Sequence, residues 1–166
     1  MFRVDGEITV PGLEVGRLFV GGCDCCHDFV HFLASGGVVL SDYELLSVDL
    51  SYDNLGSPLI AEYGKVQTHV CVCAGFRFMK INQITVRGFA DEPDVYVGSV
   101  FVQNTAVDVL KALRRNAIVL INCQNGLERA PALALAVVLL SNDKLNYDQA
   151  VSIVKTGRDG AFSGEF

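Results

Sequence analysis

A chain of 166 residues is long enough for one well-filled hydrophobic core and too short for two ordinary domains, so we expect a single domain over residues 1–166. Hydrophobic residues make up 51% of the chain and charged residues 19%, which excludes an intrinsically disordered protein. The formal net charge of -6, without a run of Lys or Arg, argues against a nucleic-acid-binding protein, because phosphate backbones are bound through clustered basic side chains.

Neither a membrane span nor a secretory signal is expected. The longest apolar run, Ala130–Leu140, is far shorter than the roughly 18 residues that cross a bilayer as a helix. Residues 1–7 include acids and lack the apolar stretch of a secretory signal, so we expect a cytoplasmic protein whose cysteines stay reduced. Nothing in the sequence indicates an oligomeric state. The six cysteines, interpreted as thiols, are Cys23, Cys25, Cys26, Cys71, Cys73 and Cys123.

The first half of the chain is difficult to assign. Apolar content and periodicity predict a strand over Arg17–Val20, a short helix over Asp24–Ala34 and a second strand over Val66–Cys73. Between this helix and the second strand, residues 36–64 contain a Gly-Ser-Pro turn signal and alternating segments such as Leu46–Leu50. We interpret this stretch as an inserted hairpin or a long surface excursion.

The second half is clearer. Residues 105–115 place apolar and charged side chains on opposite faces, which predicts an amphipathic helix capped by Asn104 or Thr105. Ala117–Ile121 is a short, β-branched, fully apolar run. Such a run is typical of a central parallel strand that is covered on both faces.

Two further helices follow this strand. Ala and Leu predominate from about Arg129 to Leu140, which predicts a buried helix. Another helix is predicted to open at Asn146 or Tyr147 and to stop near Gly157. The succession of strand, loop and helix predicts an α/β fold, with a mostly parallel twisted central sheet flanked by helices on both faces.

Cys123 lies where the central strand gives way to the buried helix. A cysteine in this place meets backbone N–H groups and the positive end of the helix dipole, which stabilise its thiolate. Five residues separate it from Arg129, enough to wrap a ring of N–H groups around a tetrahedral phosphate dianion. Arg129 can then hold two phosphate oxygens in a bidentate clamp. The expected phosphate-binding residues are Gln124, Asn125, Gly126, Leu127, Glu128 and Arg129.

The alternative is a buried structural cysteine and a surface arginine that share this spacing by chance, because a bare Cys-x5-Arg pattern is weak on its own. Gly126 inside the loop permits backbone conformations that other residues resist. Together with the apolar strand before the loop and the apolar helix after it, this glycine favours the functional interpretation.

Over residues 66–166 the chain resembles the dual-specificity branch of the cysteine-dependent protein tyrosine phosphatase superfamily, whose signature is a Cys-x5-Arg loop between strand and helix. The resemblance implies that Cys123 is the nucleophile, that Arg129 binds the phosphoryl group and that no metal or other cofactor is required. It also implies a general-acid aspartate on a loop upstream of the nucleophile, a place that Asp91 occupies. Asp94 is the rival, and a solvated acidic turn is the alternative for either.

Two positions depart from the family pattern. Asn122 stands where relatives usually carry a His that supports the thiolate. Ala130 stands where they usually carry Ser or Thr, whose hydroxyl helps the thiolate to leave the phospho-enzyme. The departures imply a slow, atypical enzyme, or a phosphate-binding module without turnover. Arg158 matches an Arg that closes the family's penultimate helix, and we expect a structural role for it.

The implied partner is a phosphorylated protein substrate, with phosphotyrosine ahead of phosphoserine and phosphothreonine. Glu128 places an acid beside the loop, which repels polyanionic inositol phosphates, and the loop contains no Lys. Phosphoinositides and nucleic-acid 5′-phosphates are the alternative substrates.

Other thiols suggest two further hypotheses. Cys73 lies where the phosphatase and tensin homologue group carries a cysteine that pairs with its nucleophile, so the resemblance suggests a Cys73–Cys123 redox switch. Simple packing of a buried thiol is the alternative. A zinc site is a weaker hypothesis, because Cys-x-Cys-Cys-His is not a usual zinc motif, and we assign no metal. Its candidate ligands are Cys23, Cys25, Cys26, His27 and His31.

Overall fold

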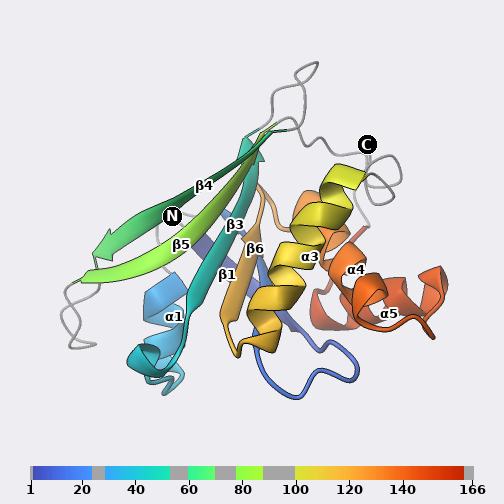
Figure 1. Cartoon of the computed structure of the whole chain (residues 1–166), viewed down its shortest axis with the longest axis horizontal. Coiled ribbons are helices and arrows are strands. Elements are labelled where there is room, and N and C mark those ends of the chain that lie inside the picture. Colours follow the sequence, from blue (N-terminus) through green and yellow to red (C-terminus); the bar gives the residue numbers. More distant parts are fainter. Residues whose placement is uncertain (1, 24–28, 53–59, 70–77, 88–99, 163–166) are drawn as a thin grey trace.

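The computed structural model describes residues 2–23, 29–52, 60–69, 78–87 and 100–162 (Figure 1). In this part of the chain no helix is both long enough and apolar enough to cross a membrane. The described elements are β1 (Phe2–Ile8), β2 (Arg17–Cys23), α1 (Phe29–Ser35), the 3-10 turn η1 (Leu40–Asp42), β3 (Leu45–Tyr52), β4 (Ile60–His69), β5 (Phe78–Arg87), α3 (Val100–Arg114), β6 (Ile118–Asn122), α4 (Arg129–Ser141) and α5 (Tyr147–Gly157).

The strands form one twisted six-stranded sheet in the order β1-β2-β6-β3-β5-β4 (Figure 1). The four inner strands β2, β6, β3 and β5 run parallel to one another, whereas the edge strands β1 and β4 pair antiparallel with β2 and β5. The prediction of an α/β fold with a mostly parallel central sheet is therefore confirmed.

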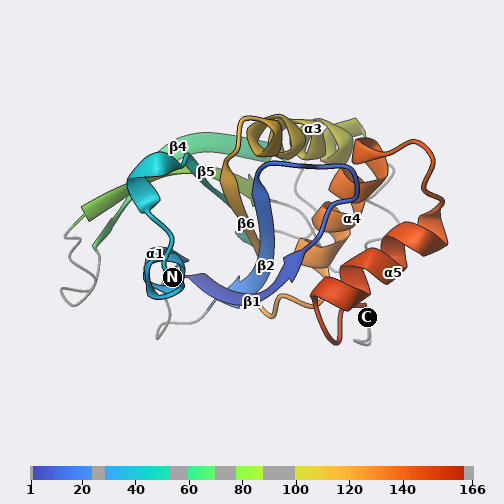
Figure 2. The ribbon, with the colours of Figure 1, turned by 90° about the horizontal axis from the view of Figure 1, so that it is seen from below.

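Strand β6 carries the core on both of its faces. Val119 and Ile121 contact the larger apolar cluster, which is filled from α3, α4 and α5. Ile118 and Leu120 point to the opposite face and pack in a smaller cluster that includes Phe29 of α1. Figure 2 shows α1 on one side of the sheet and α4 and α5 on the other. The prediction of helices on both faces is confirmed, and burial on two sides explains why the strand is apolar throughout.

The helices in the second half agree with the predicted ones except at one boundary. Helix α4 begins at Arg129 as expected. Helix α5 begins with a capping box, in which Asn146 Oδ1 accepts a hydrogen bond from Gln149 N at 2.8 Å and Gln149 Oε1 accepts one from Asn146 N at 3.0 Å. Helix α3 starts at Val100, so the predicted cap at Asn104 or Thr105 is wrong: these residues lie inside the helix, and Thr105 is buried.

The stretch 36–64 differs most from its interpretation. It contains β3, a central strand between β6 and β5, so an inserted hairpin or surface excursion is the wrong description of residues 45–52. Leu46, Val48 and Leu50 enter the larger core, but the intervening polar residues Ser47 and Asp49 are buried as well. Alternation of apolar and polar residues normally indicates a strand with one solvent-exposed face. Here both faces are buried, so the pattern is misleading.

Other strands were also missed or misplaced by the sequence patterns. Strands β1 and β5 have no counterpart among the predicted elements, and β4 begins at Ile60, well before the predicted strand at Val66. The last residues of that predicted strand, and the first residues of the predicted helix at Asp24, lie outside the described part of the chain.

A side-chain hydrogen bond joins the edge strand β4 to helix α3. The phenol of Tyr63 donates to Asp108 Oδ2 at 2.6 Å. This bond, with smaller contributions from burial and from the negative charge of the carboxylate, raises the pKa of Tyr63 to about 12. The bond requires a protonated phenol, so it stabilises the folded state fully below the ordinary tyrosine pKa of about 10 and is lost as the pH rises toward the raised value.

We therefore expect Tyr63 to ionise well above the ordinary tyrosine pKa in a titration followed by phenolate absorbance of the folded protein. Replacement Asp108→Asn removes the charged acceptor and should return this tyrosine to the ordinary range, while Tyr63→Phe should delete the late step altogether. Identical alkaline titration curves for the wild type and Asp108→Asn would contradict the assignment.

Candidate active site

The loop 123–128 joins the carboxyl end of β6 to the start of α4, at the centre of the sheet. Cys123 is the first residue after the strand and is buried, with 2% of its surface exposed. Its backbone N–H donates to Gly21 O of the neighbouring strand β2 at 3.2 Å. The predicted succession of strand, cysteine loop and helix is therefore present, and the backbone of Cys123 is hydrogen-bonded to the sheet.

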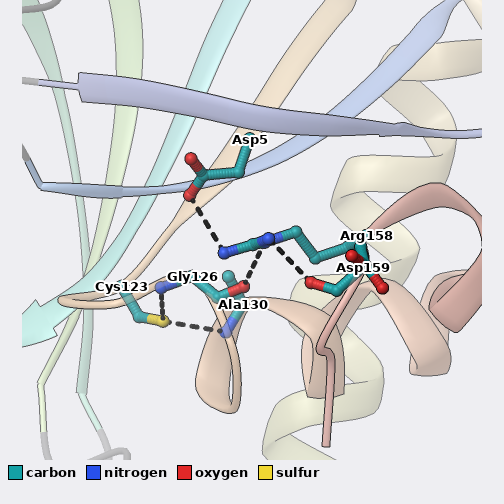
Figure 3. A network of polar contacts seen from close by, with 6 residues as sticks. All are labelled: Asp5, Cys123, Gly126, Ala130, Arg158 and Asp159. Atoms are coloured by element: carbon teal, nitrogen blue, oxygen red, sulfur yellow. Dashed lines mark hydrogen bonds and ion pairs between the residues drawn. The ribbon is translucent and has the colours of Figure 1, made fainter.

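Two backbone N–H groups are directed at the sulfur of Cys123 (Figure 3). Gly126 N lies 3.2 Å from Cys123 Sγ, and Ala130 N, in the first turn of α4, lies 3.4 Å from it. Donors at a helix N-terminus favour negative charge on the group that they face. The arrangement offers two backbone donors to the sulfur of Cys123, and a negatively charged sulfur is the nucleophilic form of cysteine.

Gly126 occupies a place that no other residue fits. Its φ of +71° lies in the left-handed region, which L side chains rarely adopt. A Cβ atom on this residue would lie 2.7 Å from the carbonyl carbon of Gly21 and 2.8 Å from Asp5 Oδ2. Both the backbone conformation and the crowding behind the loop require glycine here.

The carbonyls of the loop are bonded to the C-terminal turn. Arg158 Nε donates to Gly126 O at 3.1 Å, and Phe162 N donates to Leu127 O at 2.9 Å. Arg158 Nη1 also donates to the carbonyl of Asp159 at 2.7 Å. The structural role expected for Arg158 thus takes a specific form: it holds the backbone of the loop that carries Cys123.

Arg129 begins helix α4 and is buried, with 4% of its surface exposed. Its Nη1 atom donates to Leu50 O, in the second half of β3, at 2.8 Å. One amino group of the guanidinium is therefore held by the backbone of an inner strand of the sheet. Its role as a bidentate phosphate clamp stays a prediction.

Asn122 forms a buried side-chain bond with the neighbouring strand. The two residues Asn122 and Asp49 are in register on β6 and β3, and Asn122 Nδ2 donates to Asp49 Oδ1 at 3.1 Å. Asn122, which departs from the family pattern, thus links β6 to β3 through its side chain. Asp49 was missed by the sequence patterns, although a lone acid within the apolar run Val48–Leu50 is a signal that could have drawn attention to it.

The structure describes only some of the predicted site residues. Within the loop, Gln124 and Asn125 are exposed, whereas Leu127 and Glu128 are partly buried. The expected acid Asp91, its rival Asp94 and the redox candidate Cys73 lie outside the described residues. So do three of the five candidate zinc ligands, and the side chains of the other two are not described; among described residues no group of three His, Cys, Asp or Glu could hold a metal.

Comparisons with known proteins place this site in a familiar fold. No known family model matches the sequence, and no curated protein sequence matches it either. Many solved structures match the chain, among them three phosphatases with TM-scores between 0.54 and 0.58. A single-substitution variant of human DUSP28 is 19% identical, and the match covers 94% of this chain and 84% of that one (TM-score 0.54).

Two further structures extend the comparison. The Trypanosoma brucei protein tyrosine phosphatase TbPTP1 is 16% identical, with coverage of 95% of this chain and 67% of that one (TM-score 0.58). The kinase associated phosphatase, solved with serine in place of its catalytic-site cysteine, is 12% identical, with coverage of 98% and 88% (TM-score 0.57). The chain therefore has the fold of the dual-specificity and protein tyrosine phosphatases, which confirms the sequence resemblance at the level of the fold.

The crowding behind Gly126 can be separated from its backbone conformation by a matched pair of substitutions. Gly12 also has a positive φ, of +79°, but its Cβ position is open. We expect Gly12→Ala to cost about 1–2 kcal/mol for the left-handed conformation alone. Gly126→Ala should lower the free energy of unfolding, measured with denaturant, by more than this. It should also abolish binding of tungstate, a tetrahedral oxyanion that stands in for phosphate, measured by calorimetry. Equal losses of stability with intact tungstate binding would contradict the described packing.

Proposed function

We propose that this chain is a cysteine-dependent phosphoprotein phosphatase that hydrolyses phosphotyrosine, with phosphoserine and phosphothreonine as further substrates. One observation carries the proposal: the sulfur of Cys123 lies at the carboxyl end of a central parallel strand and faces the N–H groups of Gly126 and Ala130. The fold shared with cysteine-based protein phosphatases supports the same reaction class.

In the proposed mechanism, the thiolate of Cys123 attacks phosphorus, an S–P bond forms and the P–O bond to the leaving group breaks. Asp91 gives its proton to the departing oxygen, because an alkoxide or phenolate leaves poorly without one. Water then gives a proton to the Asp91 carboxylate and attacks phosphorus, the S–P bond breaks, inorganic phosphate leaves, and both the thiolate and the protonated Asp91 are restored. Arg129 balances the charge of the phosphoryl oxygens in both steps. The assignments of Asp91 and Arg129 rest on the family resemblance.

The bonding of the loop backbone supports an oxyanion site. Because Gly126 O and Leu127 O accept hydrogen bonds from the C-terminal turn, these carbonyl dipoles are engaged by donors of their own. Carbonyl oxygens that instead faced the pocket would repel a phosphate dianion. Glu128 within the loop, and the absence of Lys from it, favour a phosphoprotein over a phosphoinositide substrate.

A phosphate-binding module with little or no turnover is the second candidate. Two residues favour it: Asn122, which is bonded to Asp49 within the sheet, and Ala130, which offers only its backbone N–H to the sulfur. Such a module would bind phosphopeptides without consuming them. The two candidates differ in one measurable property, the cysteine-dependent release of phosphate.

Hydrolysis of p-nitrophenyl phosphate decides between the two. We expect a wild-type rate that falls by more than about a thousandfold in Cys123→Ser, as when the nucleophile of a covalent catalyst is removed. Cys71→Ser, which removes a thiol outside the loop, is the matched control and should keep its activity. Phosphopeptide binding without any release of phosphate by the wild type would exclude the enzyme.

The missing hydroxyl at Ala130 predicts a second kinetic property. Without it, breakdown of the cysteinyl phosphate should limit turnover, so rapid mixing should show a burst of nitrophenolate followed by a slow steady rate. Ala130→Ser supplies a hydroxyl next to an N–H already 3.4 Å from the sulfur, and it should raise the steady rate and shrink the burst.

Ala132→Ser is the control for that experiment, because it adds the same hydroxyl to the same buried helix, where the backbone N–H is bonded to Glu128 O rather than directed at the sulfur. A wild type without a burst, and with the same steady rate as Ala130→Ser, would show that breakdown of the intermediate is not limiting.

A further inference from the structure

Asp5 lies far from the loop motif in sequence but next to it in space. It belongs to the edge strand β1, and its carboxylate reaches the back of the loop, where Asp5 Oδ2 lies 2.8 Å from the position that a Cβ on Gly126 would take. The same oxygen is 3.5 Å from Arg158 Nη2. Both side chains are 16% exposed, so this ion pair is better shielded from water than a surface pair.

A local irregularity in the strand brings Asp5 to this place. Strand β1 pairs antiparallel with β2, but the register shifts between Val4, which faces Gly21, and Gly6, which faces Val20. Asp5 is therefore the extra residue of a β-bulge. Bulges redirect side chains and occur frequently next to active sites. Gly21, opposite the bulge, is also the residue that accepts the backbone hydrogen bond of Cys123.

The guanidinium of Arg158 lies between Asp5 and the loop (Figure 3). Each of its nitrogens has a partner: Nε donates to Gly126 O, Nη1 donates to Asp159 O and Nη2 faces Asp5. Among these partners Asp5 alone comes from the sheet, since the other two belong to the loop and to the turn that carries the arginine. Asp5 therefore fixes the arginine against the body of the protein.

We propose that Asp5 is a positioning residue for the nucleophile: it orients Arg158, which holds the carbonyl of Gly126 and so restricts the backbone of this glycine, whose own N–H is directed at Cys123 Sγ. The proposal rests on the proposed function for its catalytic consequence and on the chain of contacts for its physical basis. When Asp5 is removed, Arg158 loses its anchor in the sheet. The Gly126 carbonyl is then free to turn, and the loop binds an oxyanion less well.

The test compares Asp5→Ala with Glu7→Ala, a matched control on the same strand. Glu7 Oε2 forms an ion pair with Arg17 Nε at 2.8 Å, in which both side chains are more exposed than those of the Asp5–Arg158 pair. For Asp5→Ala we expect tungstate affinity and the rate of phospho-enzyme formation to fall by about tenfold, since small displacements of catalytic groups have effects of this order or larger. Glu7→Ala should change neither quantity.

A double-variant cycle separates positioning from general destabilisation. If Asp5 acts through Arg158, then Asp5→Ala should have little further effect on tungstate affinity in an Arg158→Gln background. Asp5→Asn keeps the shape of the side chain and an acceptor oxygen, so it should recover part of the loss. Thermal unfolding shows whether each variant folds. If Asp5→Ala does not fold, Asp5→Asn takes its place in the test.

The outcomes distinguish this inference from the proposed function. Suppose that the wild type hydrolyses aryl phosphate and that Asp5→Ala and Asp5→Asn have the same activity and the same tungstate affinity as the wild type. This result overturns the inference and leaves the function intact. Additive losses in the Arg158→Gln background also overturn it. A wild type that binds tungstate without hydrolysis, with weaker binding in the Asp5 variants, overturns the function and supports the inference. Absence of both hydrolysis and tungstate binding in the wild type overturns both.

Discussion

The orientation of a few peptide groups in one loop is the constraint on which the rest of this structure depends. The N–H groups of Gly126 and Ala130 face Cys123 Sγ, while the carbonyls of Gly126 and Leu127 are bonded to the C-terminal turn. A peptide group turned the other way would present an oxygen to an anion, and in a buried site the penalty is large because little water screens it. The left-handed conformation of Gly126 makes this arrangement sterically accessible.

The sheet supplies the rigid frame for that loop. Strand β6 is buried on both faces and paired on both edges, so the point from which the loop departs has little freedom. Both neighbouring strands also bond to the site: β2 through Gly21 O to the backbone of Cys123, and β3 through Leu50 O to Arg129 and Asp49 to Asn122. Functional groups held on regular elements keep their geometry better than groups held on loops alone.

How much the sequence predicted depended on how local the determining interactions are. Helices α4 and α5, the strand before Cys123 and the loop itself follow from nearby residues, and each is present as predicted. Strand β3 was misjudged because its polar residues are buried by partners distant in the chain. The contact of Asp5 with the loop could not be predicted at all, because it depends on a bulge and on tertiary packing. The roles of Asp91, Arg129 and Cys73 stay predictions.

The bond from Phe162 N–H to Leu127 O, together with the Asp5–Arg158 pair, joins residues from near both ends of the described chain at one place. The Asp5–Arg158 pair spans most of the described chain, so its closure costs more conformational entropy than that of a local contact, and the pair is lost when either end detaches. Competence of the site is therefore coupled to cooperative folding of the whole molecule. A partially unfolded chain would keep the thiol of Cys123 but lose the N–H groups that face its sulfur, so the arrangement of the site depends on the intact fold.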